Sequence, residues 1–145
     1  MLEDAVSNAY GNNAVIVECL VFENTPQQEA KIHVDGLSPG REGSTEVALN
    51  LPLLNPNGAY MIWYGGDYKL LNSYNPATGV EYLDVAWTSF PKEIHRQEIL
   101  RPSLVKVDTP HRVTNLKDTP RVMMSLRFNP QIYFLDSKTT TAPTG

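Results

Sequence analysis

Proline and glycine recur along the whole chain and limit how far any regular element can run. There are 11 prolines and 9 glycines among the 145 residues. The stretches between them are short and rich in valine, isoleucine, leucine, tyrosine and tryptophan, most of which favour β-strands. Breakers at this spacing suit many short strands better than long helices. The sequence therefore predicts an all-β, or mainly β, sandwich or barrel with few or short helices.

The apolar stretches mark individual strands. We expect strands at 14–22, 27–35, 46–51, 59–64 and 121–128, with 131–135 as a further candidate. Residues 80–87 fit either a strand or a helix, 92–100 fit neither period well, and 65–79 predict a loop with an apolar pair at Leu70 and Leu71. The first dozen residues show no firm period. We expect one domain over residues 1–136 and a frayed, threonine-rich tail over 137–145.

Composition narrows the classes of protein. Hydrophobic residues make up 41% of the chain and charged residues 19%, which indicates a folded globular domain. The net charge of −4 argues against a protein that binds nucleic acid through phosphate contacts. No apolar run is long enough to cross a bilayer, and no leader opens the chain. The single cysteine, Cys19, lies in an apolar run, so we expect it in the core of a cytoplasmic protein.

Four residues carry the strongest chemical signal. His33 and Asp35 are two positions apart on an expected strand, so their side chains point to the same face. His111 follows from a distant segment, and Arg121 comes ten positions after it, at the start of a strand. Two imidazoles and one carboxylate are the ligand set of a facially capped Fe(II) ion with open coordination positions. An arginine fork suits the far carboxylate of 2-oxoglutarate.

Three segments resemble the core of the Fe(II)/2-oxoglutarate-dependent oxygenases, in particular the small members from phage and bacteria. They are His33-Val34-Asp35, His111 to Asn115 and Arg121 to Ser125, and the resemblance runs from about residue 32 to 128. It implies a double-stranded β-helix, or jelly roll, with the metal between two sheets. It also implies consumption of 2-oxoglutarate and O₂, release of succinate and CO₂, and hydroxylation of a C–H bond.

The resemblance implies a role for each site residue. His33, Asp35 and His111 would bind iron, and Arg121 would pair with the distal carboxylate of 2-oxoglutarate. Ser125 would assist as a second co-substrate residue, although many relatives place this serine two positions after the arginine and here it is four. Asn50 and Tyr64 are both candidates to orient the co-substrate. Relatives usually carry N-terminal helices, for which this chain has almost no room, so a minimal form and a fragment both remain open.

Other classes of protein remain open on the sequence. The four residues could be unrelated polar side chains on a jelly-roll binding or structural protein, such as a virion component. A cupin-like metal protein without 2-oxoglutarate is a third hypothesis, although cupins favour a His-x-His pair followed by a glutamate. An Arg121 that points toward His111 beside a roomy site would favour the oxygenase, whereas a solvated Arg121 would favour the binding protein. His95 lies in a charged stretch and is expected to be solvated.

Two features near these residues also have functional interpretations. Residues 38–43 follow Asp35 and are glycine-rich, which makes them a candidate lid over the site. Four aromatic residues are interpreted mainly as core and rim, with a wall for substrate as the alternative: Tyr60, Trp63, Tyr64 and Tyr68. The substrate and the oligomeric state are not indicated by any pattern in the sequence.

Overall fold

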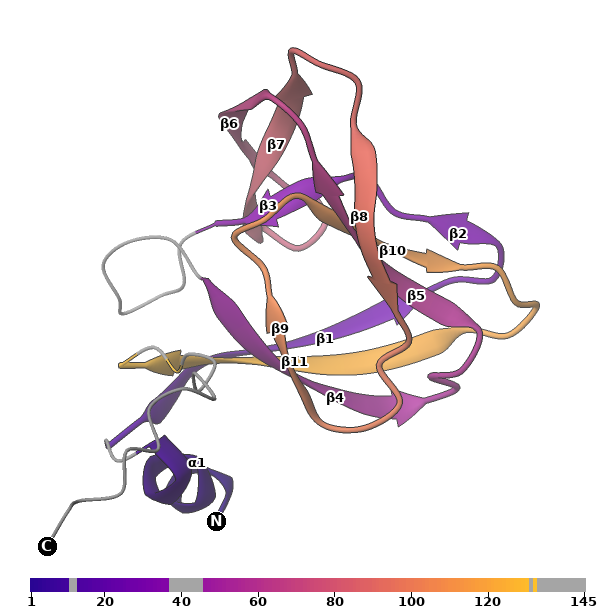
Figure 1. Ribbon diagram of the computed structural model, residues 1–145. Coiled ribbons are helices and arrows are strands. Elements are labelled where there is room, and N and C mark those ends of the chain that lie inside the picture. The colour runs from indigo at the N-terminus through magenta and orange to yellow at the C-terminus, as the bar shows by residue number, and fades with distance from the viewer. Residues whose placement is uncertain (11–12, 37–45, 131, 133–145) are drawn as a thin grey trace, which may run out of the picture.

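The computed structural model describes residues 1–10, 13–36, 46–130 and 132. The protein is mainly β, with one short helix and two antiparallel sheets (Figure 1). The elements in chain order are α1 (Leu2–Tyr10), β1 (Val15–Asn24), β2 (Gln28–Glu29), β3 (His33–Asp35), β4 (Val47–Leu54), β5 (Ala59–Gly65), β6 (Tyr68–Tyr74), β7 (Glu81–Trp87), β8 (Lys92–Gln97), β9 (Ser103–Lys106), β10 (His111–Asn115) and β11 (Arg121–Asn129).

The strands divide between the two sheets. The first sheet has the order β1-β11-β4-β9. The second has the order β6-β7-β3-β10-β5-β8, and the short β2 pairs with β10 beside β3. Every pairing is antiparallel, and the two sheets lie face to face over much of their area (Figure 1). A core of buried apolar side chains fills the space between them, including Ala48, Met61, Trp63, Val105 and Met123.

Alternate residues of β11 contribute apolar side chains to the two opposite faces of the first sheet. Its odd positions, such as Met123, face the second sheet, whereas its even positions Leu126 and Phe128 face outward. Helix α1 packs on this outer face through Val6. A bulge in β1 between Ile16 and Glu18 shifts the register, so the outward Ile16 packs with this second cluster. From Glu18 onward the even positions of β1 turn toward the interior.

The strands expected from runs of apolar residues are largely confirmed. The expected strands at 46–51, 59–64 and 121–128 are confirmed as β4, β5 and β11, and the one at 14–22 overlaps β1 from residue 15 onward. The segment expected at 27–35 is split into β2 and β3, and the ambiguous 80–87 is strand β7. Residues 116–120 connect β10 to β11.

Three other predictions were wrong or incomplete. The expected loop at 65–79 contains β6, which pairs with β7 in a hairpin that extends beyond the body of the protein (Figure 1). Five of the seven β6 residues are exposed, including Leu71 at 55%, so no alternation of buried and exposed positions marks this strand in the sequence. Strand β8 is also exposed along its whole length and escaped prediction for the same reason. Residues 2–10, where the sequence shows no firm period, form helix α1.

Cys19 is exposed, contrary to the expectation of a core position. Strand β1 is an edge strand, and Cys19 lies on its outward side, where Val21 is also exposed. The tail at 137–145, the candidate lid at 38–43 and all but one residue of the candidate strand at 131–135 lie outside the described residues. Across the part of the chain that is described, no helix is long and apolar enough to span a membrane.

Candidate metal centre

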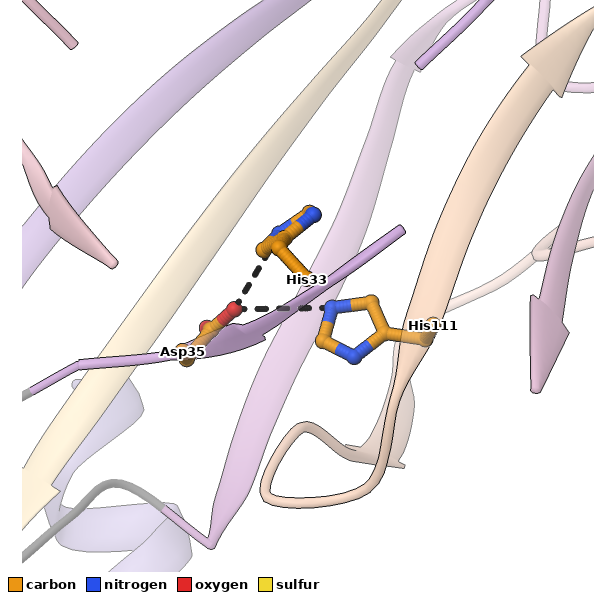
Figure 2. Close-up of side chains that lie close together, drawn as sticks. All are labelled: His33, Asp35 and His111. Carbon is orange, nitrogen blue, oxygen red and sulfur yellow. Dashed lines mark ion pairs between the residues drawn. The ribbon is translucent and has the colours of Figure 1, made fainter. Parts of the chain in front are cut away.

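His33, Asp35 and His111 come together in the second sheet. His33 and Asp35 are the first and last residues of β3, so the strand period of two places both side chains on the inner face. His111 begins β10 and is the direct cross-strand partner of His33. Figure 2 shows one carboxylate oxygen of Asp35 directed toward both imidazole rings. The sequence predicted the shared face of the first two residues, and strand pairing adds the third.

The distances among the three side chains suit a common ion. Asp35 Oδ1 lies 3.5 Å from His33 Nε2 and 3.4 Å from His111 Nε2. One candidate ligand atom from each residue lies within 4.8 Å of the other two. Adjacent ligands around an octahedral ion with bonds of about 2.1 Å are about 3 Å apart. The three residues could therefore bind one ion after small side-chain adjustments.

Both imidazoles are oriented by the same local hydrogen bond. His33 Nδ1 lies 3.0 Å from the carbonyl oxygen of Lys31, and His111 Nδ1 lies 2.8 Å from that of Thr109. A carbonyl oxygen can only accept, so each Nδ1 carries the hydrogen and donates it. The lone pair of a neutral ring is then on Nε2, which is the atom that faces Asp35. Such hydrogen bonds to the other ring nitrogen are usual for histidines that bind metals.

Asp35 is held as a carboxylate. Burial alone would raise its pKa, but hydrogen bonds from His111 and His33 and the positive charge of Arg127 hold the pKa well below its usual range. Burial likewise lowers the pKa of His33, yet its hydrogen bond to Asp35 and the charge of that carboxylate outweigh burial and raise the pKa overall. A metal ion that binds His33 would have to compete with this proton.

Arg127 is the site residue that sequence analysis missed. It is only 3% exposed, and its Nη2 donates a hydrogen bond to Asp35 Oδ2. Its Nη1 donates to Ser125 Oγ at 2.6 Å, and the Ser125 hydroxyl donates to Asn50 Oδ1. One signal was present in the sequence, because alternation along β11 places Arg121, Ser125 and Arg127 on a single face with a buried strand around them.

A cavity of about 630 Å³ adjoins the site. His33, Asp35 and Arg127 line one part of it, and inward positions of β1 line a wall that continues to Asn24. Another part of the lining comes from the turn after β6 and the start of β7. Several lining side chains are apolar, including Leu20, Phe22, Pro76, Val80 and Tyr82. Tyr82 also makes an edge contact with the His33 ring, at 5.9 Å between ring centroids.

Arg121 lies at the Asn24 end of this wall. Its side chain is 3% exposed, and its Nη1 donates to Asn24 Oδ1 at 2.7 Å. Its buried Nε has no hydrogen-bond partner among the described residues. Burial lowers the pKa of Arg121 to about 10. Arg121, the arginine predicted to bind a carboxylate, is therefore a desolvated cation. Six strand positions, or about 20 Å, separate its backbone from that of Arg127.

Asn115 holds the segments around Arg121 in place. Nδ2 of this fully buried residue lies within hydrogen-bond distance of three carbonyl oxygens, those of Asn24 at 3.0 Å, Thr25 at 3.2 Å and Thr119 at 2.9 Å, so its two hydrogens are shared among them. It thereby ties the end of β1 to the turn that leads into Arg121. Sequence analysis gave neither Asn24 nor Asn115 a structural role, because the contacts that join β1 to this region link residues 90 to 97 positions apart.

The remaining sequence candidates lie elsewhere. Ser125 and Asn50 face the cavity side of the first sheet and bond to each other and to Arg127. The Tyr64 ring instead lies near the Arg112 guanidinium, 5.5 Å away, on the other face of the second sheet. His95 is exposed, as expected, and packs against the Trp63 ring.

The class that fold and geometry define is a mainly antiparallel β protein with a candidate two-histidine, one-carboxylate metal centre. Comparison of the chain with protein-family models, curated proteins and solved structures gave no significant match.

Proposed function

We propose that this protein is a non-haem Fe(II) and 2-oxoglutarate-dependent dioxygenase that hydroxylates a C–H bond and releases succinate and CO₂. The observation that carries the proposal is the convergence of His33, Asp35 and His111, with both Nε2 atoms facing one carboxylate oxygen. Three protein ligands on one side leave other positions of an octahedral ion open for a co-substrate and O₂.

The donor set fits a divalent iron. Imidazole nitrogen and carboxylate oxygen are ligands that iron accepts, and Nδ1 of each histidine is already committed to a backbone carbonyl. Bound Fe(II) supplies the redox chemistry with O₂ that no side chain can provide. The residues of the chain hold the ion, orient the co-substrate and, through the apolar lining of the cavity, limit the access of water.

We also propose that the fold is a double-stranded β-helix. The strand pairs are nested along the chain: β1 pairs with β11, β3 with β10, β4 with β9 and β5 with β8. These pairs alternate between the two sheets. A long antiparallel hairpin rolled into a jelly roll gives this nesting. The β6–β7 hairpin would then be an insertion that extends the second sheet next to β3.

Arg121 supports 2-oxoglutarate as the co-substrate. Its guanidinium is buried, and no carboxylate pairs with it in the described part of the chain. A buried cation without a counter-ion is costly, whereas a bidentate carboxylate would neutralise it. Because Asn24 lines the same cavity as His33 and Asp35, a dicarboxylate in that cavity could approach both the metal and Arg121.

The lining disfavours phosphorylated substrates. Two cations occur among the described lining residues, and each already has a carboxylate partner: Lys31 lies 2.7 Å from Asp84, and Arg127 is bonded to Asp35. Apolar side chains form much of the remaining wall. An uncharged or positively charged substrate with an exposed C–H bond fits this lining better than a phosphate ester.

An anaerobic titration with Fe(II) and 2-oxoglutarate tests the proposed function. Wild type should develop the visible charge-transfer band of the 2-oxoglutarate chelate. Asp35→Ala should abolish the band, because the only anionic ligand is lost. Arg121→Met should still bind metal, while the 2-oxoglutarate concentration needed for half-saturation rises by at least about tenfold.

His95→Ala is the matched control, since this exposed histidine lies outside the site and its variant should titrate like wild type. Metal binding by wild type without a band at saturating 2-oxoglutarate would exclude the dioxygenase and favour a cupin-like metal protein. Failure of wild type to bind metal at all would favour a non-catalytic binding or structural protein.

A further inference from the structure

We infer that Arg127 is a positioning residue for the metal centre: it holds Asp35 so that a single carboxylate oxygen, Oδ1, is available to the ion. The inference rests on the proposed metal site and adds a residue to it. It depends on contacts across the two sheets, because Arg127 belongs to β11 in the first sheet and Asp35 to β3 in the second.

The two carboxylate oxygens of Asp35 have different partners. Oδ1 faces the Nε2 atoms of His33 and His111, at 3.5 and 3.4 Å. Oδ2 faces away from them and accepts a hydrogen bond from Arg127 Nη2. A carboxylate with both oxygens free can rotate and bind a metal through both. With Oδ2 engaged by a cation, binding through Oδ1 alone is favoured, and one more coordination position stays open.

The guanidinium is itself held in orientation. Its Nη1 donates to Ser125 Oγ at 2.6 Å, and the hydroxyl proton of Ser125 goes to Asn50 Oδ1. Asn50 and Ser125 are cross-strand partners on β4 and β11, so sheet pairing fixes their spacing. The side chains of Arg127, Ser125 and Asn50 are each at least nine-tenths buried, so little water can compete for the hydrogen bonds among them.

A lysine at position 127 could not hold Asp35 in the same orientation. A guanidinium presents two NH₂ groups in one plane, and here each serves a different acceptor, Ser125 and Asp35. An ammonium at the end of a flexible chain would keep the charge near Asp35 but not the fixed direction between the two acceptors. Charge and geometry can therefore be separated by substitution.

Co(II) binding to the whole protein, without 2-oxoglutarate, is the test. Wild type should bind one Co(II) with a defined visible d–d spectrum. Arg127→Met should bind Co(II) about 10–100-fold more weakly and with altered band intensity, as expected when the partner that orients a ligand is lost. Arg127→Lys should recover part of the affinity but not the wild-type spectrum. Ser125→Ala should shift both readouts in the same direction, by less than about tenfold.

Arg96→Met is the matched control, because Arg96 forms a similar two-point pair with Glu93 at 2.8 Å but on the exposed β8. A folded Arg127→Met protein with wild-type affinity and spectrum would overturn the inference. If that variant does not fold, a Ser125→Ala protein identical to wild type in both readouts would overturn it as well. Wild type that fails to bind Co(II) would overturn both proposals. Wild type that binds Co(II) but forms no 2-oxoglutarate chelate would overturn only the dioxygenase.

Discussion

Strand β11 carries two buried arginines that differ in the charge of their partners. Arg121 and Arg127 are each 3% exposed and lie on the same face of the strand. Arg127 has a carboxylate partner in Asp35, whereas the partner of Arg121 is the neutral amide of Asn24. A cation that is neutralised within the fold stabilises and orients its partner. A cation that is buried without a carboxylate is costly, and we propose that the distal carboxylate of 2-oxoglutarate neutralises it at Arg121.

The largest expected effect concerns the stability of the metal-free protein. Arg127→Met should lower the free energy of unfolding by about 3–5 kcal/mol, because it leaves the carboxylate of Asp35 buried without its cation. The matched Arg121→Met should change it by less than about 1 kcal/mol, since the removed charge has no ionic partner. Urea unfolding of both variants measures the difference. Equal losses would show that the two arginines play the same structural role.

The co-substrate should stabilise the protein through only one of the two arginines. With Co(II) bound, 2-oxoglutarate at a hundred times its dissociation constant should raise the free energy of unfolding of wild type by about 2.7 kcal/mol. Arg121→Met at the same concentrations should gain far less, because the distal carboxylate has lost its partner. Thermal unfolding with and without 2-oxoglutarate measures this. An unchanged gain in the variant would remove Arg121 from the co-substrate site.

Metal affinity should depend on pH through His33. Despite burial, the hydrogen bond to Asp35 and the charge of that carboxylate raise the pKa of His33 above the ordinary 6.5, so a proton competes with the ion at a higher pH than for a free imidazole. Below that pKa the affinity for Co(II) should fall about tenfold per pH unit, equivalent to about 1.4 kcal/mol. Calorimetric titrations between pH 6 and 8 measure the slope. His95→Ala should leave the profile unchanged, and a flat profile in wild type would argue against His33 as a ligand.

The metal-free protein should respond to pH through the same pair. Because the folded pKa of His33 is raised, its contribution to stability is complete below pH 6.5 and is lost as the pH rises through the folded value. The folded pKa of Asp35 is lowered, so its contribution is present above the unfolded pKa and is lost as the pH falls through the folded one. His33 and Asp35 should therefore contribute most to the free energy of unfolding in mildly acidic solution, where both contributions are present.

The smallest effect should come from the exposed cysteine. Cys19→Ser should change the free energy of unfolding by less than about 0.5 kcal/mol, because the side chain lies on the open side of an edge strand. Metal and 2-oxoglutarate titrations should match wild type. A larger loss would mean that this face of β1 is covered in solution.

The alternation of residues within a strand predicted those parts of the site whose residues lie close together in the sequence. The period of a strand placed His33 beside Asp35, and the alternation in β11 put Arg121, Ser125 and Arg127 on one face. The exposed strands β6 and β8 escaped prediction, because a strand that buries neither face carries no hydrophobic period.

By itself, the sequence determined that the chain folds from short strands and that a histidine and an aspartate share one strand face, since both follow from the local geometry of the backbone. Only the tertiary structure decided that His111 pairs with His33, that Arg127 reaches Asp35 and that Arg121 is left with Asn24. These contacts join residues between 78 and 97 positions apart along the chain, so they depend on strand register and on how two sheets pack.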